Sequence, residues 1–165
     1  PFIFGRGGEE QAWLTARGIK VDIVPGITAA LGCASASGIP LTHRGTAQAV
    51  TLLTGTAGGR LPDLDWQAIA ATRATLAVYM GVGTAGALRG KLIAAGADPA
   101  TPVAIIENGT LESERITTGR LDRLAALVDS NAVRAPALLI IGEVVAIAGE
   151  AGCPRRAPTD LALVS

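Results

Sequence analysis

The sequence predicts an α/β fold, in which a mixed sheet is covered by helices. Two patterns carry this prediction. Short apolar runs of strand length alternate along the chain with helix-like segments, and Gly- or Pro-containing turns separate them. One run, residues 137–141, is apolar at every position, which is typical of a central strand that is buried on both faces.

The composition agrees with a folded domain. The 165 residues fit one ordinary domain with a sizeable core, and 49% of them are hydrophobic while only 17% are charged. Fourteen basic and fourteen acidic residues cancel, so no overall field would attract nucleic acid or a membrane surface. No apolar run approaches the roughly 20 residues of a spanning helix, and no signal peptide is visible. We therefore expect a cytoplasmic protein without nucleic-acid or membrane partners.

The two cysteines, Cys33 and Cys153, lie far apart in the sequence. Cys33 falls in an apolar stretch of small residues, so we expect a buried free thiol there. No cluster of Cys and His has the spacing of a metal site, and we expect no metal. This cysteine usage fits a reducing compartment.

The expected strands follow from apolar runs and β-branched residues. They cover residues 20–24, 48–54, 75–80, 103–107, 114–118 and 137–141.

The expected helices follow from small or acidic residues at their starts and glycines near their ends. They cover residues 9–17, 28–37, 84–95 and 121–129, with a short helix that opens at Asp65 and Trp66. Glycine, proline and arginine from Gly149 onward suggest a tail at 149–165 that we expect to be flexible.

Three sequence blocks near the start of the chain carry the strongest functional signal. They read PFIFGRGGEE at 1–10, VPGITAA at 24–30 and GIPLTHR at 38–44. In order and spacing they resemble the uroporphyrinogen-III C-methyltransferases of the tetrapyrrole methylase superfamily. In that family a Gly-Gly-Asp usually comes directly before the first block. The resemblance therefore implies that residues 1–148 are the C-terminal portion of a tetrapyrrole methylase domain.

The resemblance also implies a fold and an activity. The fold would be the second of two α/β domains, with S-adenosyl-L-methionine as the methyl donor. The reaction would be methylation of uroporphyrinogen III to precorrin-2 (dihydrosirohydrochlorin), on the route to sirohaem and cobalamin, and the enzyme would be a homodimer. The family's acid and base residues belong to the first domain, so catalytic residues stay unassigned, and we expect this chain alone to be inactive.

The cofactor residues that the resemblance implies are Ile3, Thr28, Ala29, Met80 and Gly109. Three of these positions also have a physical reason for contact. Thr28 and Ala29 open a helix, where backbone N–H groups lack partners within the helix. A glycine at 109 would let the backbone approach a ligand closely. Each position also has an ordinary structural interpretation as a turn or core residue.

The implied substrate carries many carboxylates, and two arginines fall within the family blocks. We expect Arg6 and Arg44 to bind substrate, because a guanidinium pairs with a carboxylate through two hydrogen bonds. The competing interpretation for each arginine is an ordinary ion pair. His43 is the only histidine, and without a carboxylate in its motif we assign it no catalytic role.

A dinucleotide-binding interpretation competes with this assignment. Residues 81–86 read G-x-G-x-x-G after an apolar run, and Glu107 lies at the position of a ribose-binding acid in a dinucleotide fold. With 21 glycines in the chain such a match arises easily, so we expect a simple turn. Two further functions stay open on the sequence: a precorrin or diphthine methylase of the same fold, and a non-catalytic fragment that only folds or dimerises.

Overall fold

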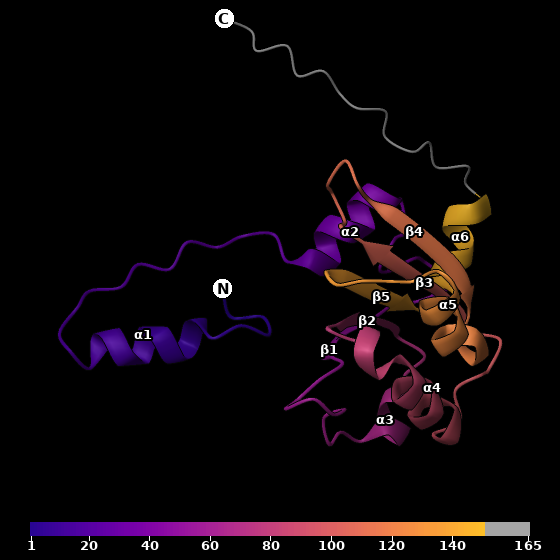
Figure 1. Ribbon diagram of the computed structural model, residues 1–165, viewed down its shortest axis with the longest axis horizontal. Coiled ribbons are helices and arrows are strands. Elements are labelled where there is room, and N and C mark those ends of the chain that lie inside the picture. Colours follow the sequence, from indigo (N-terminus) through magenta and orange to yellow (C-terminus); the bar gives the residue numbers. More distant parts are fainter. Residues whose placement is uncertain (151–165) are drawn as a thin grey trace, which may run out of the picture.

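A five-stranded mixed sheet forms the centre of the molecule in the computed structural model, which describes residues 1–150 (Figure 1). The strand order is β1-β2-β5-β3-β4. The strands are β1 Val50–Thr54, β2 Thr75–Tyr79, β3 Pro102–Glu107, β4 Arg115–Arg120 and β5 Ala137–Ile141. Only β1 and β2 pair in parallel, and every other neighbouring pair is antiparallel. The α/β fold with a mixed sheet is confirmed, and the all-apolar strand β5 lies in the middle.

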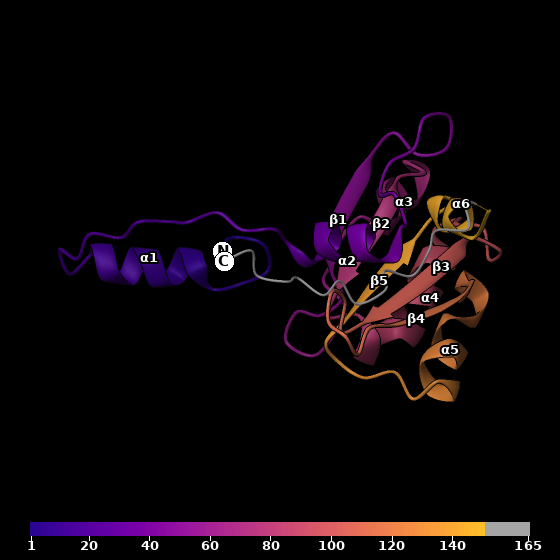
Figure 2. The ribbon, with the colours of Figure 1, turned by 90° about the horizontal axis from the view of Figure 1, so that it is seen from above.

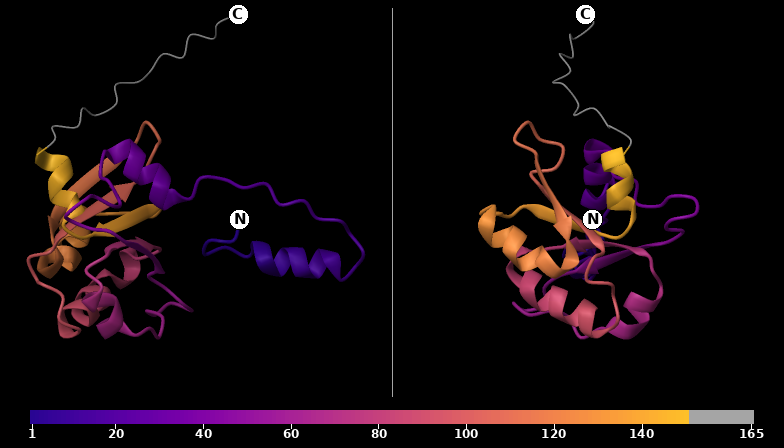
Figure 3. Two further views of the ribbon diagram at one scale, coloured as in Figure 1. Left: turned by 180° about the vertical axis from the view of Figure 1, so that it is seen from behind. Right: turned by 90° about the vertical axis from the view of Figure 1, so that its right-hand side faces the viewer.

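Helices cover both faces of the sheet. Side chains at alternate strand positions enter two separate cores, so Val103 and Ile105 lie in one core while Ala104 and Ile106 lie in the other. The first face carries α3 Trp66–Ala71, α4 Ala85–Ala94 and α5 Leu124–Ser130, and the second carries α2 Ala29–Ser37 and α6 Val144–Glu150. Figure 3 shows α2 and α6 side by side on the second face.

Local sequence signals explain two of the helix boundaries. The side chain of Asp65 accepts a hydrogen bond from the Ala68 N–H at 2.9 Å and caps α3. Gly38 ends α2 with a φ of 68°, which glycine adopts without steric cost. Short 3-10 turns, η1 Val82–Thr84 and η2 Leu121–Arg123, precede α4 and α5. Helix α6 was not among the expected elements, although its apolar sequence suits a helix packed on the sheet.

Residues 1–28 form an arm that projects from the sheet domain, and it contains α1 Gly7–Thr15 (Figures 1 and 2). The strand expected at residues 20–24 is wrong, because this segment is extended but pairs with no strand of the described chain. Its β-branched residues favour an extended backbone, yet a strand also needs a neighbour for its N–H and C=O groups.

One further expectation concerns the C-terminal end of the described region. The expected tail at 149–165 begins within the last two residues of α6, and the rest of it lies outside the described residues. Among residues 1–150, none of the helices combines the length and the apolar character needed to cross a bilayer.

Candidate functional site

A cavity of about 590 Å³ opens at the edge of the sheet where β2 and β3 end and β5 begins. This volume lies within the range of about 300–1,000 Å³ that is common for small-molecule sites. The residues around it are mostly apolar and come from α2, from the turns after β2 and β3, and from the start of β5. They include Ala29, Met80, Gly109, Ile106, Pro136 and Leu138. Three expected cofactor residues, Ala29, Met80 and Gly109, therefore line one cavity.

The sheet topology explains why these distant segments meet. Strands β2 and β3 both run antiparallel to β5, which lies between them, so both end at the same edge of the sheet. Leu138 of β5 pairs in register with Tyr79 of β2 on one side and with Ile106 of β3 on the other. These three residues form a row across the sheet, and all three line the cavity.

Three residues beside this edge have an unusual backbone conformation. Met80, Asn108 and Thr110 have φ values of 54°, 49° and 72°, in the left-handed region that residues other than glycine seldom adopt. Hydrogen bonds hold the turn after β3 in place. The Asn108 N–H donates to Pro136 O at 3.0 Å, and the Thr110 N–H donates to Glu114 Oε2 at 2.7 Å. Strained backbone of this kind concentrates at binding sites.

Tyr79 fixes the start of α2 above the cavity. Thr28 is the N-cap residue of α2, but its side chain makes no capping hydrogen bond. Instead the Ala30 N–H donates to Tyr79 Oη at 2.9 Å, and Thr28 Oγ1 lies 2.6 Å from the same oxygen. The Phe4 ring also packs on the Tyr79 ring, with centroids 5.1 Å apart.

Gly109 is constrained by packing against α2. A Cβ at this position would collide with Cys33 Sγ and would approach Ile106 Cγ2 to 3.3 Å. The glycine therefore allows α2 to lie close to the turn after β3, which differs from the expected reason of ligand approach. Cys33 is buried and free, as expected. Burial raises the pKa of its thiol, and the negative charge of Glu114 raises this pKa further.

The remaining expected site residues lie outside the cavity lining. Ile3 is 48% exposed in the segment before α1, beside Phe4. Thr28 does not line the cavity, but its hydroxyl group forms a hydrogen bond with Tyr79, which does. Arg6 is exposed and forms an ion pair with Glu9, at 2.6 Å from Nε to Oε2. Arg44 is exposed in a turn that His43 and Ala47 close through reciprocal backbone hydrogen bonds. The structure therefore does not bring Arg6 and Arg44 to the cavity.

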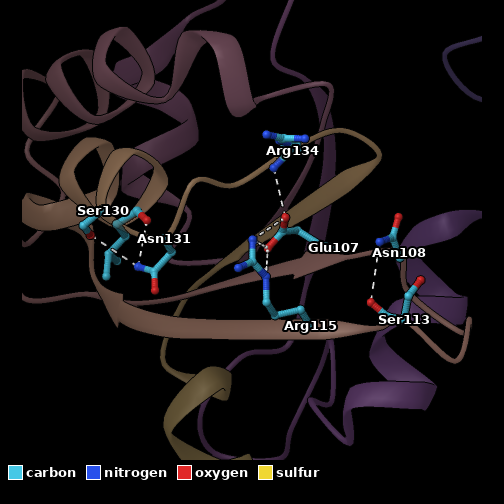
Figure 4. A network of polar contacts seen from close by, with 8 residues as sticks. Glu107, Asn108, Ser113, Arg115, Ser130, Asn131 and Arg134 are labelled. Atoms are coloured by element: carbon cyan, nitrogen blue, oxygen red, sulfur yellow. Dashed lines mark hydrogen bonds and ion pairs between the residues drawn. The ribbon is translucent and has the colours of Figure 1, made fainter.

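The structure contradicts the dinucleotide-binding interpretation. The Glu107 carboxylate accepts hydrogen bonds from Arg115 Nε at 2.6 Å, Arg115 Nη2 at 2.7 Å and the Arg134 N–H at 2.9 Å (Figure 4). The Arg115 hydrogen bonds hold the pKa of Glu107 below its usual value, against the opposing effect of burial. A ribose would have to displace these partners.

The strand arrangement also differs from a dinucleotide fold. The strand after the helix of such a motif lies beside the first strand and parallel to it. Here β5 separates β2 from β3. Gly81 instead meets a packing requirement, because a Cβ there would approach Leu139 Cδ1 to 2.8 Å. Gly81 and Gly83 therefore lie in the turn from β2 to α4, as expected, while Gly86 lies in the first turn of α4.

A second cavity, of about 430 Å³, lies at the opposite edge of the sheet between α3, α4 and the residues that follow β5. None of the expected site residues lines it. Within residues 1–150 no group of three or more His, Cys, Asp or Glu side chains is placed to hold a metal ion.

Several residues that the structure places at the first cavity were not among the expected cofactor residues. Tyr79, Asn108 and Pro136 line it, and Tyr79 also bonds to the start of α2. One signal is present in the sequence, since Tyr79 is the only tyrosine of the chain and directly precedes Met80. The contact of Tyr79 with Thr28 spans 51 positions, which no local pattern reveals.

Comparisons with known proteins agree with this architecture. The profile of the tetrapyrrole (corrin/porphyrin) methylases matches residues 1–125. A siroheme synthase of Pseudoalteromonas translucida is 51% identical over 147 residues, which are 89% of this chain and 31% of the relative. A siroheme synthase of Xylella fastidiosa is 50% identical over 148 residues, which are 90% of this chain and 31% of that relative. The chain thus spans about a third of the length of these relatives.

Solved structures share the fold. The uroporphyrin-III C-methyl transferase of Thermus thermophilus, complexed with S-adenosyl homocysteine, is 41% identical with a TM-score of 0.77. The match covers 89% of this chain and 64% of that one. A cobalt precorrin-4 methyltransferase superposes with a TM-score of 0.80 at 24% identity over 88% of this chain and 61% of that one, and it supports the fold alone. With the profile match over most of its length, the chain belongs to the tetrapyrrole methylase family.

Proposed function

We propose that this chain contributes the cofactor cavity of an S-adenosyl-L-methionine-dependent enzyme that methylates uroporphyrinogen III to precorrin-2. The observation that carries the proposal is the convergence of Ala29, Met80 and Gly109 on one apolar cavity. Identity of about half to siroheme synthases supports the same reaction. The Thermus thermophilus relative, which was solved with S-adenosyl homocysteine, supports the same cofactor.

The cavity suits the two ends of such a cofactor. Its apolar floor, with Met80, Val82 and Leu138, fits the flat base of the cofactor. Polar contacts would come from the start of α2. There Ala30 and Leu31 already donate to Tyr79 Oη and Thr28 O, so the Ala29 N–H is the amide that a ligand would use.

S-adenosyl-L-methionine, when bound, supplies an electrophilic methyl group on sulfur. The residues of this chain would bind and orient the cofactor and keep water away from its sulfur. Ala29, Met80 and Gly109 would form the walls, and Thr28 would contact the cofactor from the helix start. Ile3 would contact the cofactor from the segment before α1, where the neighbouring Phe4 packs on Tyr79. Alignment of this kind lowers the entropic part of the reaction barrier.

We also propose that Arg6 and Arg44 bind substrate carboxylates outside the cofactor cavity. Both guanidinium groups belong to exposed residues, so they are accessible to a large anionic substrate. In the natural protein that carries this chain, Arg44→Ala should raise the KM for the tetrapyrrole about tenfold, since a charge-assisted hydrogen bond contributes roughly 1.5–3 kcal/mol. Affinity for S-adenosylhomocysteine should not change. A lower melting temperature with an unaltered KM would instead assign Arg44 a structural role.

We further propose a cytoplasmic homodimer. Exposed apolar side chains on the arm, including Phe2, Trp13 and Ile27, support self-association. Sedimentation equilibrium of the natural protein should give twice the monomer mass, and a single monomeric species would contradict this part of the proposal.

The central experiment measures binding and methyl transfer separately. Calorimetry with S-adenosylhomocysteine should show saturable heat for the natural protein that carries this chain. Labelled S-adenosyl-L-methionine should transfer its methyl group to uroporphyrinogen III, whereas residues 1–165 alone should leave the tetrapyrrole unlabelled. Saturable NADH binding without heat from S-adenosylhomocysteine would refute the proposed function.

A further inference from the structure

We infer that Tyr79 is a positioning residue whose hydroxyl group sets the geometry of the S-adenosyl-L-methionine site. This inference rests on the proposed function and adds a residue to it. Tyr79 contacts three chain segments, and each of them carries an expected cofactor residue.

The first connection is to α2. Tyr79 Oη accepts from the Ala30 N–H at 2.9 Å and lies 2.6 Å from Thr28 Oγ1. The two bonded residues flank Ala29, so the hydroxyl group fixes the position of the Ala29 N–H from both sides. It also replaces the N-cap hydrogen bond that the Thr28 side chain does not make.

The second connection is to Met80. Tyr79 is the last residue of β2, and Met80 follows it with a φ of 54°. An unbranched residue other than glycine holds this conformation only when its surroundings fix the backbone on both sides. On the strand side, Tyr79 pairs with Leu138, and its carbonyl accepts from the Gly55 N–H. The anchored phenol adds a side-chain restraint to these backbone contacts.

The third connection is to the segment before α1. The Phe4 ring packs on the Tyr79 ring at an interplanar angle of 57°, and aromatic pairs favour such a tilted geometry over a face-to-face stack. Ile3 directly precedes Phe4. Tyr79 therefore forms hydrogen bonds with the residues on both sides of Ala29 and directly precedes Met80. Through Phe4 it also contacts the segment that contains Ile3.

The hydroxyl group has a further chemical consequence. A phenol oxygen that accepts from Ala30 can still donate its proton to Thr28 Oγ1. The Thr28 hydroxyl would then keep its own proton for a ligand acceptor, such as a ribose oxygen or a carboxylate of the cofactor. Removal of the Tyr79 hydroxyl would free Thr28 to rotate and would leave the Ala30 N–H without this partner.

The test uses Tyr79→Phe in the natural protein that carries this chain, because phenylalanine keeps the ring and its contact with Phe4. We expect the Kd for S-adenosylhomocysteine to rise about fivefold, equivalent to about 1 kcal/mol, and the KM for S-adenosyl-L-methionine to rise by a similar factor. Because the hydroxyl group positions the cofactor site alone, the KM for uroporphyrinogen III should stay the same. A matched control is Thr72→Val, which removes a hydroxyl that bonds Ile69 O at 2.8 Å and the Ala74 N–H at 3.3 Å at the end of α3. It should lower stability to urea without changing the Kd.

A second pair of variants keeps the inference testable if Tyr79→Phe fails to fold. Thr28→Val should weaken binding by a similar factor, whereas Thr28→Ser should retain the wild-type Kd. In the double variant Tyr79→Phe, Thr28→Val, the loss of affinity should be smaller than the product of the single losses, because both changes break one hydrogen bond. An unchanged Kd in the single variants, or strictly multiplicative losses, would overturn the inference. Wild-type protein that does not bind S-adenosylhomocysteine would instead refute the proposed function.

Discussion

The arm of residues 1–28 and the sheet domain of residues 29–150 are built from similar amino acids but reach different degrees of burial. Helix α1 has no buried residue, although Trp13 and Leu14 are apolar. Helix α4, of similar length, buries Leu88 and Leu92 against the sheet. An apolar side chain therefore contributes to stability here only where another element lies opposite.

The contacts of the arm are mainly local. Arg6 pairs with Glu9, and the Arg17 guanidinium lies 3.6 Å from the centre of the Trp13 ring. Exposed contacts of this kind contribute little, and an isolated helix of nine residues is marginal in water. The contact between Phe4 and Tyr79 is the one aromatic ring pair within residues 1–150, and it joins the arm to the sheet domain.

The largest effect should come from a matched pair of truncations in the two regions. Leu88→Ala removes a fully buried side chain and should lower the free energy of unfolding by about 2–5 kcal/mol. Trp13→Ala removes a larger side chain that is 57% exposed, and it should change the free energy of unfolding by less than about 0.5 kcal/mol. Urea unfolding of residues 1–165 measures both values. Equal losses would show that the arm packs on the domain in solution.

Ion pairs provide a second contrast. Glu107→Gln should lower the free energy of unfolding at pH 7 by about 1–2 kcal/mol, a value reduced because Arg115 is half exposed. Because folding lowers the pKa of Glu107, its contribution is complete above the unfolded carboxyl pKa of about 4.3. It is lost as the pH falls through the lower folded pKa.

The control for this contrast lies in the arm. Glu9→Gln breaks the exposed ion pair with Arg6, and it should change the free energy of unfolding by less than about 0.5 kcal/mol both at neutral and at acidic pH. Urea unfolding at pH 7 and pH 3 measures both variants. A deficit of Glu107→Gln that is equally large at pH 3 would contradict the ionic origin of its effect.

The packing of α2 on the turn after β3 gives a third test. Gly109→Ala places a methyl group against Cys33 Sγ and should lower the free energy of unfolding by about 1–3 kcal/mol. Cys33→Ala in the same chain should restore part of this loss, because it removes the colliding sulfur. Gly18→Ala serves as a comparison in the arm, where a Cβ has no neighbour within 4 Å but the φ of 73° still causes strain. If the second substitution restores nothing, the constraint on Gly109 lies elsewhere.

A fourth test concerns ligand binding in the cavity itself. In the natural protein that carries this chain, Ala29→Leu should raise the Kd for S-adenosylhomocysteine at least about tenfold, or 1.4 kcal/mol. The larger side chain would fill part of the cavity beside Met80. Leu31→Ala, at an exposed position of the same helix, should leave the Kd unchanged. Calorimetry on folded variants measures both, and an unaltered Kd for Ala29→Leu would remove Ala29 from the site.

Local patterns in the amino-acid sequence were enough to predict the main elements of this protein and its family. Apolar runs and β-branched residues located all five strands of the sheet, and the helices expected at 28–37 and from Asp65 begin within a residue of α2 and α3. These signals are local because a cap, a turn or an alternating strand depends on residues that are neighbours in the chain. The motif blocks carried family membership for the same reason.

Which of these elements meet depends on the tertiary fold. Residues 20–24 have a strand-like sequence but no partner strand, whereas β5 separates β2 from β3 and brings their ends to one cavity. Glu107 occupies a ribose-binding position in the sequence, yet its carboxylate bonds to Arg115 and Arg134. Tyr79 and Thr28 meet across 51 positions. Pairing and packing between distant segments depend on the whole chain, so no local pattern could specify them.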